Sequence, residues 1–214
     1  MRIINCKLNH LTNPLGYDLT NPTISYVVAE ARGKVQKSAR VWVSLKEDFS
    51  DCLYDSGESS EIVSTGFTLP IELKPMTRYY WKVQVTDDEG DTGVSDVQWF
   101  ETARDVTAPG SAWQAKWITP DADKSVQAVV FRDIDIEKPV RKTRGYMIGL
   151  GVYELYLNGE KQSDECLLPG FHAYDSWLQY QTFVLDLKQG GNRLELMLGD
   201  GWYKGNFGLR KRYE

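Results

Sequence analysis

The sequence predicts an all-β protein built as sandwiches of short strands. Hydrophobic and polar residues alternate with a period of two, which is the pattern of half-buried strands. The clearest segments of this kind are Arg40–Leu45, Tyr79–Val85, Val152–Leu157 and Arg193–Leu198. Turn-forming residues separate them, and we find no window of about 11 residues or more with a helical period and capping residues. Short strands at regular spacing favour sandwiches over other β architectures.

Composition sets the class of protein and excludes two kinds of partner. The chain has 214 residues, 42% of them hydrophobic, and a formal net charge of −5. No stretch approaches the roughly 18 consecutive apolar residues of a membrane span. An acidic chain also lacks the basic face that contact with nucleic-acid phosphates requires. We therefore predict a soluble protein with no membrane and no nucleic-acid partner.

The cysteines predict neither a disulfide framework nor a zinc site. Cys6, Cys52 and Cys166 lie far apart, no CxxC pair occurs, and there are only two histidines, His10 and His172. The N-terminal residues lack the apolar segment of a secretory signal. These observations predict a cytoplasmic protein, or a secreted one if a signal has been removed, with no metal site.

A domain boundary is predicted in the stretch Ala103–Ser111, which is small, polar and contains Pro and Gly. The predicted domains are residues 1–105 and 112–214. The first contains 11 basic and 16 acidic residues and the second 14 of each, so the first carries the whole net charge of 11 − 16 = −5.

The first domain contains a Leu-x-Pro-x-Thr-x-Tyr run over Leu73–Tyr79, followed by an alternating strand and a glycine turn. This pattern resembles the fibronectin type III sandwich, which is related to the immunoglobulin fold. In such a fold Tyr79 forms a tyrosine corner, with a buried ring and a hydroxyl bonded to upstream backbone. Trp81 then points inward with Tyr79. The acidic residues 87–91 fit a hairpin turn, with a calcium loop as the alternative.

The second domain carries four distinctive runs. They are Trp-x-Ala-x-Trp-Ile over Trp113–Ile118, Tyr-Glu-Leu-Tyr-x-Asn-Gly over Tyr153–Gly159, Leu-Pro-Gly-Phe-His over Leu168–His172, and Gly-Asp-Gly-Trp-Tyr-x-Gly over Gly199–Gly205. Asn158-Gly159 predicts a type I′ hairpin turn. The strand-turn-strand style is that of a galactose-binding-like jelly-roll sandwich. We expect His172 at the surface or between domains.

In order and spacing, these runs and the domain before them resemble the N-terminal region of bacterial α-L-rhamnosidases, glycoside hydrolase family 78. The resemblance covers nearly the whole chain. It implies an inverting glycosidase whose acid and base lie on a downstream (α/α)6 barrel, a helical domain that this sequence does not contain. No residue here inherits a catalytic role, so we predict a non-catalytic N-terminal fragment that positions the barrel and contacts it as a partner.

Carbohydrate contact is the function that the second domain can carry itself. Sugar recognition needs an aromatic face together with polar groups for the hydroxyls. Asp200, Trp202 and Tyr203 lie on a glycine-rich loop, and Asn158 lies on a second loop. We predict these four residues as the site for rhamnosides or other carbohydrate. The alternative is that they only form turns and packing contacts.

Two further alternatives stay open. In some relatives the equivalent jelly roll resembles a calcium-dependent rhamnose-binding module, so a calcium ion is the alternative to our prediction of no cofactor. The chain could also be a free-standing carbohydrate-binding or structural interaction module. The family's jelly roll continues beyond the Gly-Asp-Gly-Trp-Tyr loop, so we expect this domain to be truncated at its C-terminal end. The exposed edge would allow a homodimer.

Overall fold

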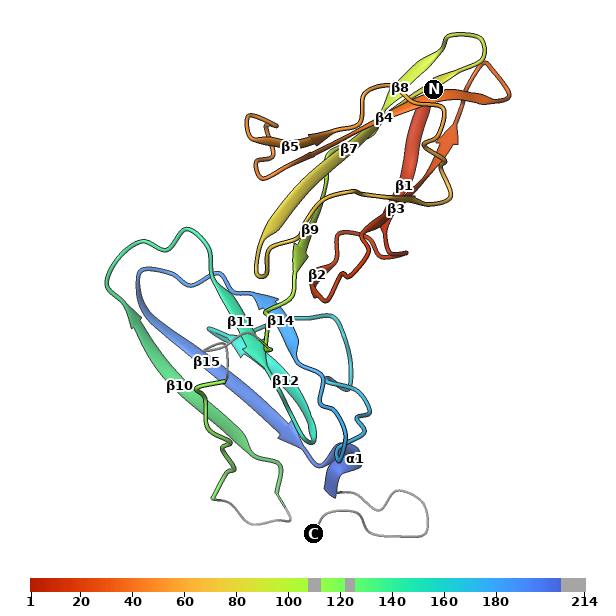
Figure 1. The fold of residues 1–214 in the computed structure, drawn as a ribbon. Coiled ribbons are helices and arrows are strands. Elements are labelled where there is room, and N and C mark those ends of the chain that lie inside the picture. Colours follow the sequence, from red (N-terminus) through yellow and green to blue (C-terminus); the bar gives the residue numbers. More distant parts are fainter. Residues whose placement is uncertain (108–112, 122–125, 205–214) are drawn as a thin grey trace. The chain divides into compact units, whose positions relative to one another are not determined.

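The computed structural model describes residues 1–107, 113–121 and 126–204 (Figure 1). It divides into two compact units, Met1–Trp113 and Gln114–Glu214. The all-β prediction is confirmed: across the described residues the regular structure consists of strands and one short helical turn, α1 (Gly201–Lys204). That turn lies where the sequence predicted a glycine-rich loop. No helix in this described part is long and apolar enough to cross a membrane.

The first unit contains two sheets. One has the order β1-β3-β6, and the other has the order β2-β9-β7-β4-β5 with β8 paired to β7. The strands are β1 (Arg2–Leu8), β2 (Leu15–Tyr17), β3 (Thr23–Ala29), β4 (Gln36–Ser44), β5 (Cys52–Asp55), β6 (Phe67–Thr68), β7 (Arg78–Asp87), β8 (Thr92–Val94) and β9 (Gln98–Thr102). β7 pairs antiparallel with both β4 and β9 and is the central strand.

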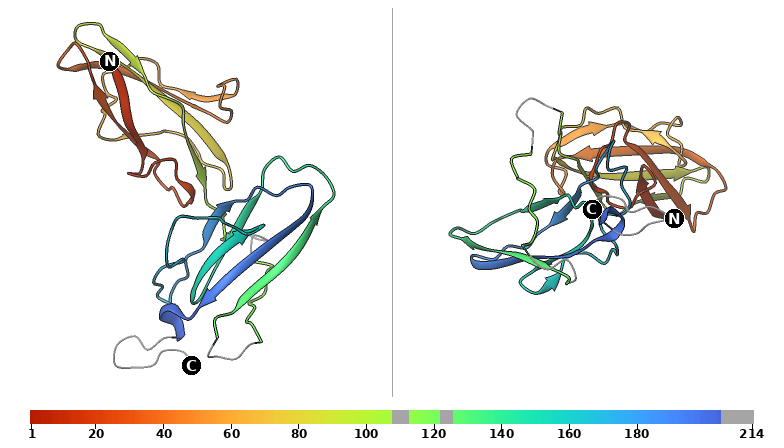
Figure 2. Two further views of the ribbon diagram at one scale, coloured as in Figure 1. Left: turned by 180° about the vertical axis from the view of Figure 1, so that it is seen from behind. Right: turned by 90° about the horizontal axis from the view of Figure 1, so that it is seen from below.

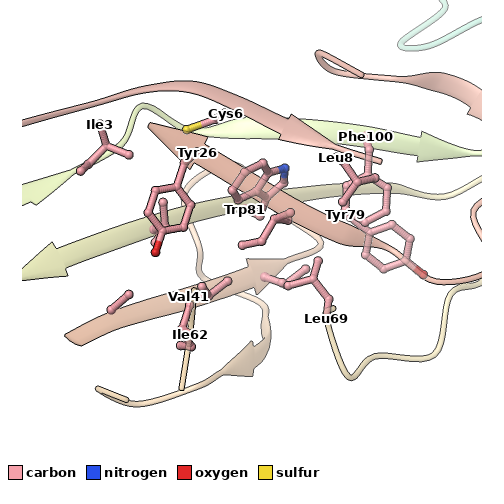
Figure 3. Packing of buried hydrophobic residues seen from close by; sticks show 14 of the residues in the cluster. Ile3, Cys6, Leu8, Tyr26, Val41, Ile62, Leu69, Tyr79, Trp81 and Phe100 are labelled. Carbon is pink, nitrogen blue, oxygen red and sulfur yellow. The ribbon is translucent and has the colours of Figure 1, made fainter. Parts of the chain in front are cut away.

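The core of this unit lies on the inward face of β7. Every second residue of the strand is buried, beginning with Tyr79 and Trp81. Both are 1% exposed, and Phe100 on β9 stacks on Tyr79 with ring centroids 5.1 Å apart. Leu8 and Tyr26 of the other sheet belong to the same cluster (Figure 3). The two sheets are therefore held together by a contiguous apolar core, as a sandwich requires.

Tyr79 forms the predicted tyrosine corner. Its ring is buried, and its hydroxyl oxygen accepts a hydrogen bond from the Lys74 N–H at 2.8 Å. We expect Tyr79→Phe to destabilise the unit by about 1–2 kcal/mol, because the Lys74 N–H loses its partner. Thermal denaturation measures the change. Tyr80→Phe is the control, since that half-buried side chain faces away from the core; an equal loss in both variants would contradict the role of the Tyr79 hydroxyl.

The acidic turn after β7 uses its carboxylates to hold the backbone. Asp87 is 2% exposed, and its oxygens accept N–H bonds from Gly33 at 2.7 Å, Asp91 at 2.8 Å and Glu89 at 3.0 Å. Burial opposes ionisation, but these donors outweigh it and hold the pKa of Asp87 below its usual value. The turn is thus the predicted hairpin, with β8 paired to β7 and a buried carboxylate that accepts bonds from backbone donors.

The second unit contains a four-stranded sheet of order β10-β15-β12-β13 and a two-stranded sheet of β11 and β14. The strands are β10 (Val129–Ile136), β11 (Arg144–Met147), β12 (Val152–Leu157), β13 (Glu160–Lys161), β14 (Gln181–Val184) and β15 (Gly190–Gly199). All pairings are antiparallel. Figure 2 shows these strands from behind and from below.

The core of the second unit lies between its two sheets. Tyr153, Leu155 and Leu157 alternate along β12 and are buried, and Phe183 of β14 belongs to the same cluster. Leucines of β15 pack against it from the neighbouring strand. The inner face of the four-stranded sheet is therefore apolar, while its other face points away from this core. The predicted truncated edge and the homodimer across it concern residues 205–214, which lie outside the described residues.

Candidate functional site

Aromatic side chains gather in the second unit where β15 ends. They come from two segments: the long connection between β13 and β14, and the helical turn α1 directly after β15. We call this group the aromatic cluster. Its members are Phe171, Tyr174, Trp177, Trp202 and Tyr203.

The connection is tied to the core strands by hydrogen bonds. The backbone N–H of Tyr153 donates to the Leu168 carbonyl at 2.7 Å. The Tyr153 hydroxyl donates to Oε1 of Gln181 at 2.6 Å, and Nε2 of Gln181 donates to the Pro169 carbonyl at 3.4 Å. A tight turn follows, in which the Trp177 N–H donates to the Ala173 carbonyl at 2.9 Å. These bonds place the aromatic residues of the connection on a fixed scaffold.

The rings meet edge to face, as aromatic quadrupoles prefer. Phe171 contacts Tyr174 with centroids 6.1 Å apart and Trp202 at 6.3 Å. Tyr174 in turn contacts Tyr203 at 5.2 Å. Phe171 and Trp177 nevertheless remain 54% and 53% exposed. The cluster is therefore an aromatic surface that offers ring faces to a ligand or to another domain.

His172 lies beneath this surface, whereas the sequence predicted a position at the surface or between domains. It is 0% exposed, and its ring packs 5.7 Å from the Tyr174 ring and 5.8 Å from the Trp177 ring, between centroids. Neither ring nitrogen has a hydrogen-bond partner among the residues that the structure describes. Burial among apolar rings lowers the pKa of His172, because it disfavours the charged form.

This buried imidazole predicts a pH-dependent stability of the second unit. The pKa of His172 is lower in the folded chain than in the unfolded chain. Above the unfolded pKa of about 6.5 the imidazole is neutral in both states. As pH falls below that value the unfolded chain takes up the proton more readily, so the free energy of unfolding decreases. We expect the melting temperature of this unit to fall between about pH 7 and pH 5, and His172→Phe to flatten that profile. His10→Gln, at the exposed histidine of the first unit, is the control. An unchanged slope in His172→Phe would contradict the prediction.

The four predicted site residues do not all come together. Asp200 directly follows β15, and its carbonyl accepts the Tyr203 N–H at 3.2 Å, which places Asp200, Trp202 and Tyr203 on one turn. Asn158 lies at the other end of the sheet: β12 and β15 pair from Val152↔Gly199 to Leu157↔Leu194. Five residues of strand separate the two ends by about 17 Å.

Asn158 has a structural role in its hairpin. Asn158 and Gly159 have φ values of 53° and 84°, as a type I′ turn requires, and β13 pairs with β12 across the turn. Oδ1 of Asn158 accepts the Arg193 N–H at 2.8 Å, and Nδ2 donates to Oδ1 of Asn192 at 3.2 Å. The side chain thus bridges two connections of the sheet.

The sequence interpretation missed Phe171, Tyr174 and Trp177 as members of this site. The available signal was the aromatic density of residues 171–180.

Within residues 1–107, 113–121 and 126–204, no group of three or more His, Cys, Asp or Glu side chains could hold a metal ion. The side chains gathered at this site offer ring stacking, with the exposed Asp200 beside them.

Comparison with known families accounts for both units. Residues 3–104 match the family model of the Rha78A-like N-terminal immunoglobulin domain, and residues 138–214 match that of the α-L-rhamnosidase N-terminal domain. The chain belongs to the α-L-rhamnosidase family. It represents the N-terminal domains of these proteins, and the predicted sandwich of fibronectin III or immunoglobulin type followed by a jelly roll is confirmed.

Two α-L-rhamnosidases from Formosa agariphila are similar over most of the chain. One is 31% identical and the match covers 93% of this chain; the other is 28% identical over 97%. The solved α-L-rhamnosidase from Dictyoglumus thermophilum is 28% identical and has a TM-score of 0.76 over 100% of this chain. The structure from Aspergillus terreus, at 23% identity and a TM-score of 0.77 over 99% of the chain, shows the same fold.

The chain spans about a quarter of the length of these relatives. It covers 24% and 25% of the two Formosa proteins and 28% of the Dictyoglumus chain. The family match therefore concerns the N-terminal domains alone.

Proposed function

We propose that the chain forms the N-terminal, non-catalytic domains of an enzyme that removes terminal α-L-rhamnose from glycosides. Its two domains position a downstream catalytic barrel, in which one carboxylic acid protonates the leaving oxygen and another activates water, with inversion. The observation that supports this is the match of both units, in order, to domains of α-L-rhamnosidases about four times as long. The three free cysteines favour a reducing compartment.

An aryl α-L-rhamnoside tests the location of catalysis. We expect the 214-residue chain to release no aryl alcohol. A protein in which the chain continues into a helical-barrel domain should turn the substrate over. Turnover by the 214 residues alone would contradict the placement of catalysis elsewhere, and an inactive longer protein would contradict the rhamnosidase assignment.

We also propose that the aromatic cluster contacts carbohydrate, through Trp202 and Tyr203 with Asp200 beside them. The exposed faces of Phe171 and Trp177 extend the surface. Asn158 is left out of this proposal, because its amide bridges Arg193 and Asn192 at the far end of the sheet. An exposed aromatic surface also supports the second candidate function, a free-standing carbohydrate-binding module.

Titration of L-rhamnose into the chain, with and without calcium, separates carbohydrate contact from scaffolding alone. If the cluster binds sugar, Trp202→Ala should weaken binding by about tenfold, the loss expected for one stacking ring. A calcium requirement would support the ion as cofactor. If neither the 214-residue chain nor its Trp202→Ala variant bound L-rhamnose, the cluster would not be a sugar site and the domains would act only as a scaffold.

A further inference from the structure

The outer face of the β10-β15-β12-β13 sheet carries a second group of side chains that the proposed function does not use. Along β12 and β15 the inward residues are core residues such as Leu155 and Leu196. Because side chains alternate, Tyr156 and Glu195 point to the opposite face. That face lies away from the two-stranded sheet that completes the core, and it shares no residue with the aromatic cluster.

Four outer-face residues lie in one register row across the sheet. Phe131 on β10 pairs with Glu195 on β15, Glu195 pairs with Tyr156 on β12, and Tyr156 pairs with Lys161 on β13. We call these four residues the outer row. Phe131 and Tyr156 are two strands apart, a spacing of about 10 Å. This is close to the distance between alternate rings of an extended pyranose chain.

Both rings of the outer row are held by neighbours on the same face. The Arg193 guanidinium lies over Phe131 at 4.5 Å from the ring centroid and is itself fixed by two bonds to Asp133 at 2.7 and 2.9 Å. The Tyr156 hydroxyl donates to Glu154 two residues earlier on the strand, at 2.7 Å. That bond ties the end of the Tyr156 side chain to its own strand. Phe131 remains 61% exposed.

The charges around the outer row are largely cancelled. Arg193 pairs with Asp133, and Lys161 pairs with Glu154 at 2.5 Å. The Glu195 carboxylate attracts the Arg193 charge but accepts no side-chain hydrogen bond from any residue in the described part of the chain. A carboxylate between two rings can accept hydroxyl hydrogen bonds, whereas a polyanion would meet no unpaired cation here. The charge pattern therefore matches a neutral, hydroxyl-rich ligand.

Because Phe131 and Tyr156 flank Glu195 in one row, we propose that the outer row binds a neutral oligosaccharide that lies across the strands. Alternate sugar rings stack on Phe131 and Tyr156, and the ring between them donates hydroxyl hydrogen bonds to Glu195. The shortest ligand that reaches both aromatic rings is a trisaccharide. This site is separate from the aromatic cluster and does not depend on the proposed contact with rhamnose there.

Calorimetric titration of the 214-residue chain with neutral linear oligosaccharides tests the proposal. The probes are rhamno-, manno- and gluco-oligosaccharides of one to six units. We expect at least one series to bind, with affinity rising steeply between two and three units, and with little dependence on salt because no charge is neutralised. Phe131→Ala and Tyr156→Ala should each weaken trisaccharide binding by about tenfold. Tyr156→Phe keeps the ring and should retain affinity within about threefold.

Tyr17→Ala is the matched control, because it removes an exposed aromatic residue, 49% exposed, that belongs to neither proposed site. It should leave trisaccharide binding unchanged. Phe131→Ala should leave any binding of L-rhamnose at the aromatic cluster unchanged, so that failure of one site does not imply failure of the other. The melting temperature of each variant confirms that it is folded. The proposal would be overturned if no series bound or if Phe131→Ala bound the trisaccharide as tightly as the unchanged chain. It would also be overturned if only acidic polygalacturonate bound.

Discussion

Replacing Trp81 with alanine is expected to unfold the first unit at temperatures at which the second unit stays folded. Trp81 is 1% exposed at the centre of β7, between Val43 of β4 and Gln98 of β9. Truncating a buried tryptophan costs about 3–5 kcal/mol, because transfer free energy is lost and a cavity remains. This is a large share of the 5–15 kcal/mol that stabilises a typical domain. The melting temperature of the unit should fall on the order of 20 °C.

Differential scanning calorimetry of the whole chain can follow this change, with the Trp81→Ala effect confined to the transition of the first unit. Trp99→Ala is the matched control. Trp99 lies on the neighbouring strand but faces outward, half-buried under the Arg78 guanidinium at 4.0 Å from its ring centroid. Loss of such a surface contact costs about 0.5–1 kcal/mol, with a further contribution from its partial burial. Equal losses in the two variants would contradict the assignment of Trp81 to the core.

Replacing Asn192 with alanine is expected to destabilise the second unit by about 2–4 kcal/mol, because buried polar groups lose their partners. Asn192 is 3% exposed at the start of β15. Its Nδ2 donates to the Lys188 and Gly190 carbonyls at 2.7 and 2.9 Å. Its Oδ1 accepts the Lys188 N–H at 2.9 Å and the Asn158 amide at 3.2 Å. One side chain thus closes the connection into β15 and links it to the β12–β13 hairpin.

Urea denaturation, followed by a signal from the second unit, measures the Asn192→Ala effect. Gln189→Ala is the control in the same connection. The Gln189 side chain is exposed and donates to the Glu137 carbonyl at 3.1 Å, so its loss should stay within about 0.5 kcal/mol. If the Asn192 variant loses no more stability than the Gln189 variant, the buried amide does not hold this connection.

Several features of the fold could be predicted from sequence because they depend on residues near one another in the chain. The alternation through Tyr79–Val85 predicts both the strand β7 and its buried face, since neighbouring side chains point to opposite sides of a strand. The tyrosine corner connects Tyr79 with a residue only five positions upstream. The turn at Asn158-Gly159 follows from the positive φ that these two residues accept.

The candidate site was only partly predictable. Asp200, Trp202 and Tyr203 were predicted together because they lie close in sequence, and the structure places them on one turn. The sequence interpretation missed Phe171, Tyr174 and Trp177, which join them only through the path of a long connection. It included Asn158, because nothing local reveals that the length of two paired strands separates this residue from Asp200.

The sequence by itself therefore determined the fold class, the two kinds of sandwich, the family and the local turns of this protein. Each depends on periodicity or on short motifs, which the chain carries wherever it folds. Only the tertiary structure decided that His172 is buried, that Asn192 links two connections, and that Phe131 and Tyr156 share one row. The burial of His172 depends on how the connection between β13 and β14 folds over it. The other two depend on strand register, which brings together residues 25 to 64 positions apart. Register is set by the burial of the whole apolar face.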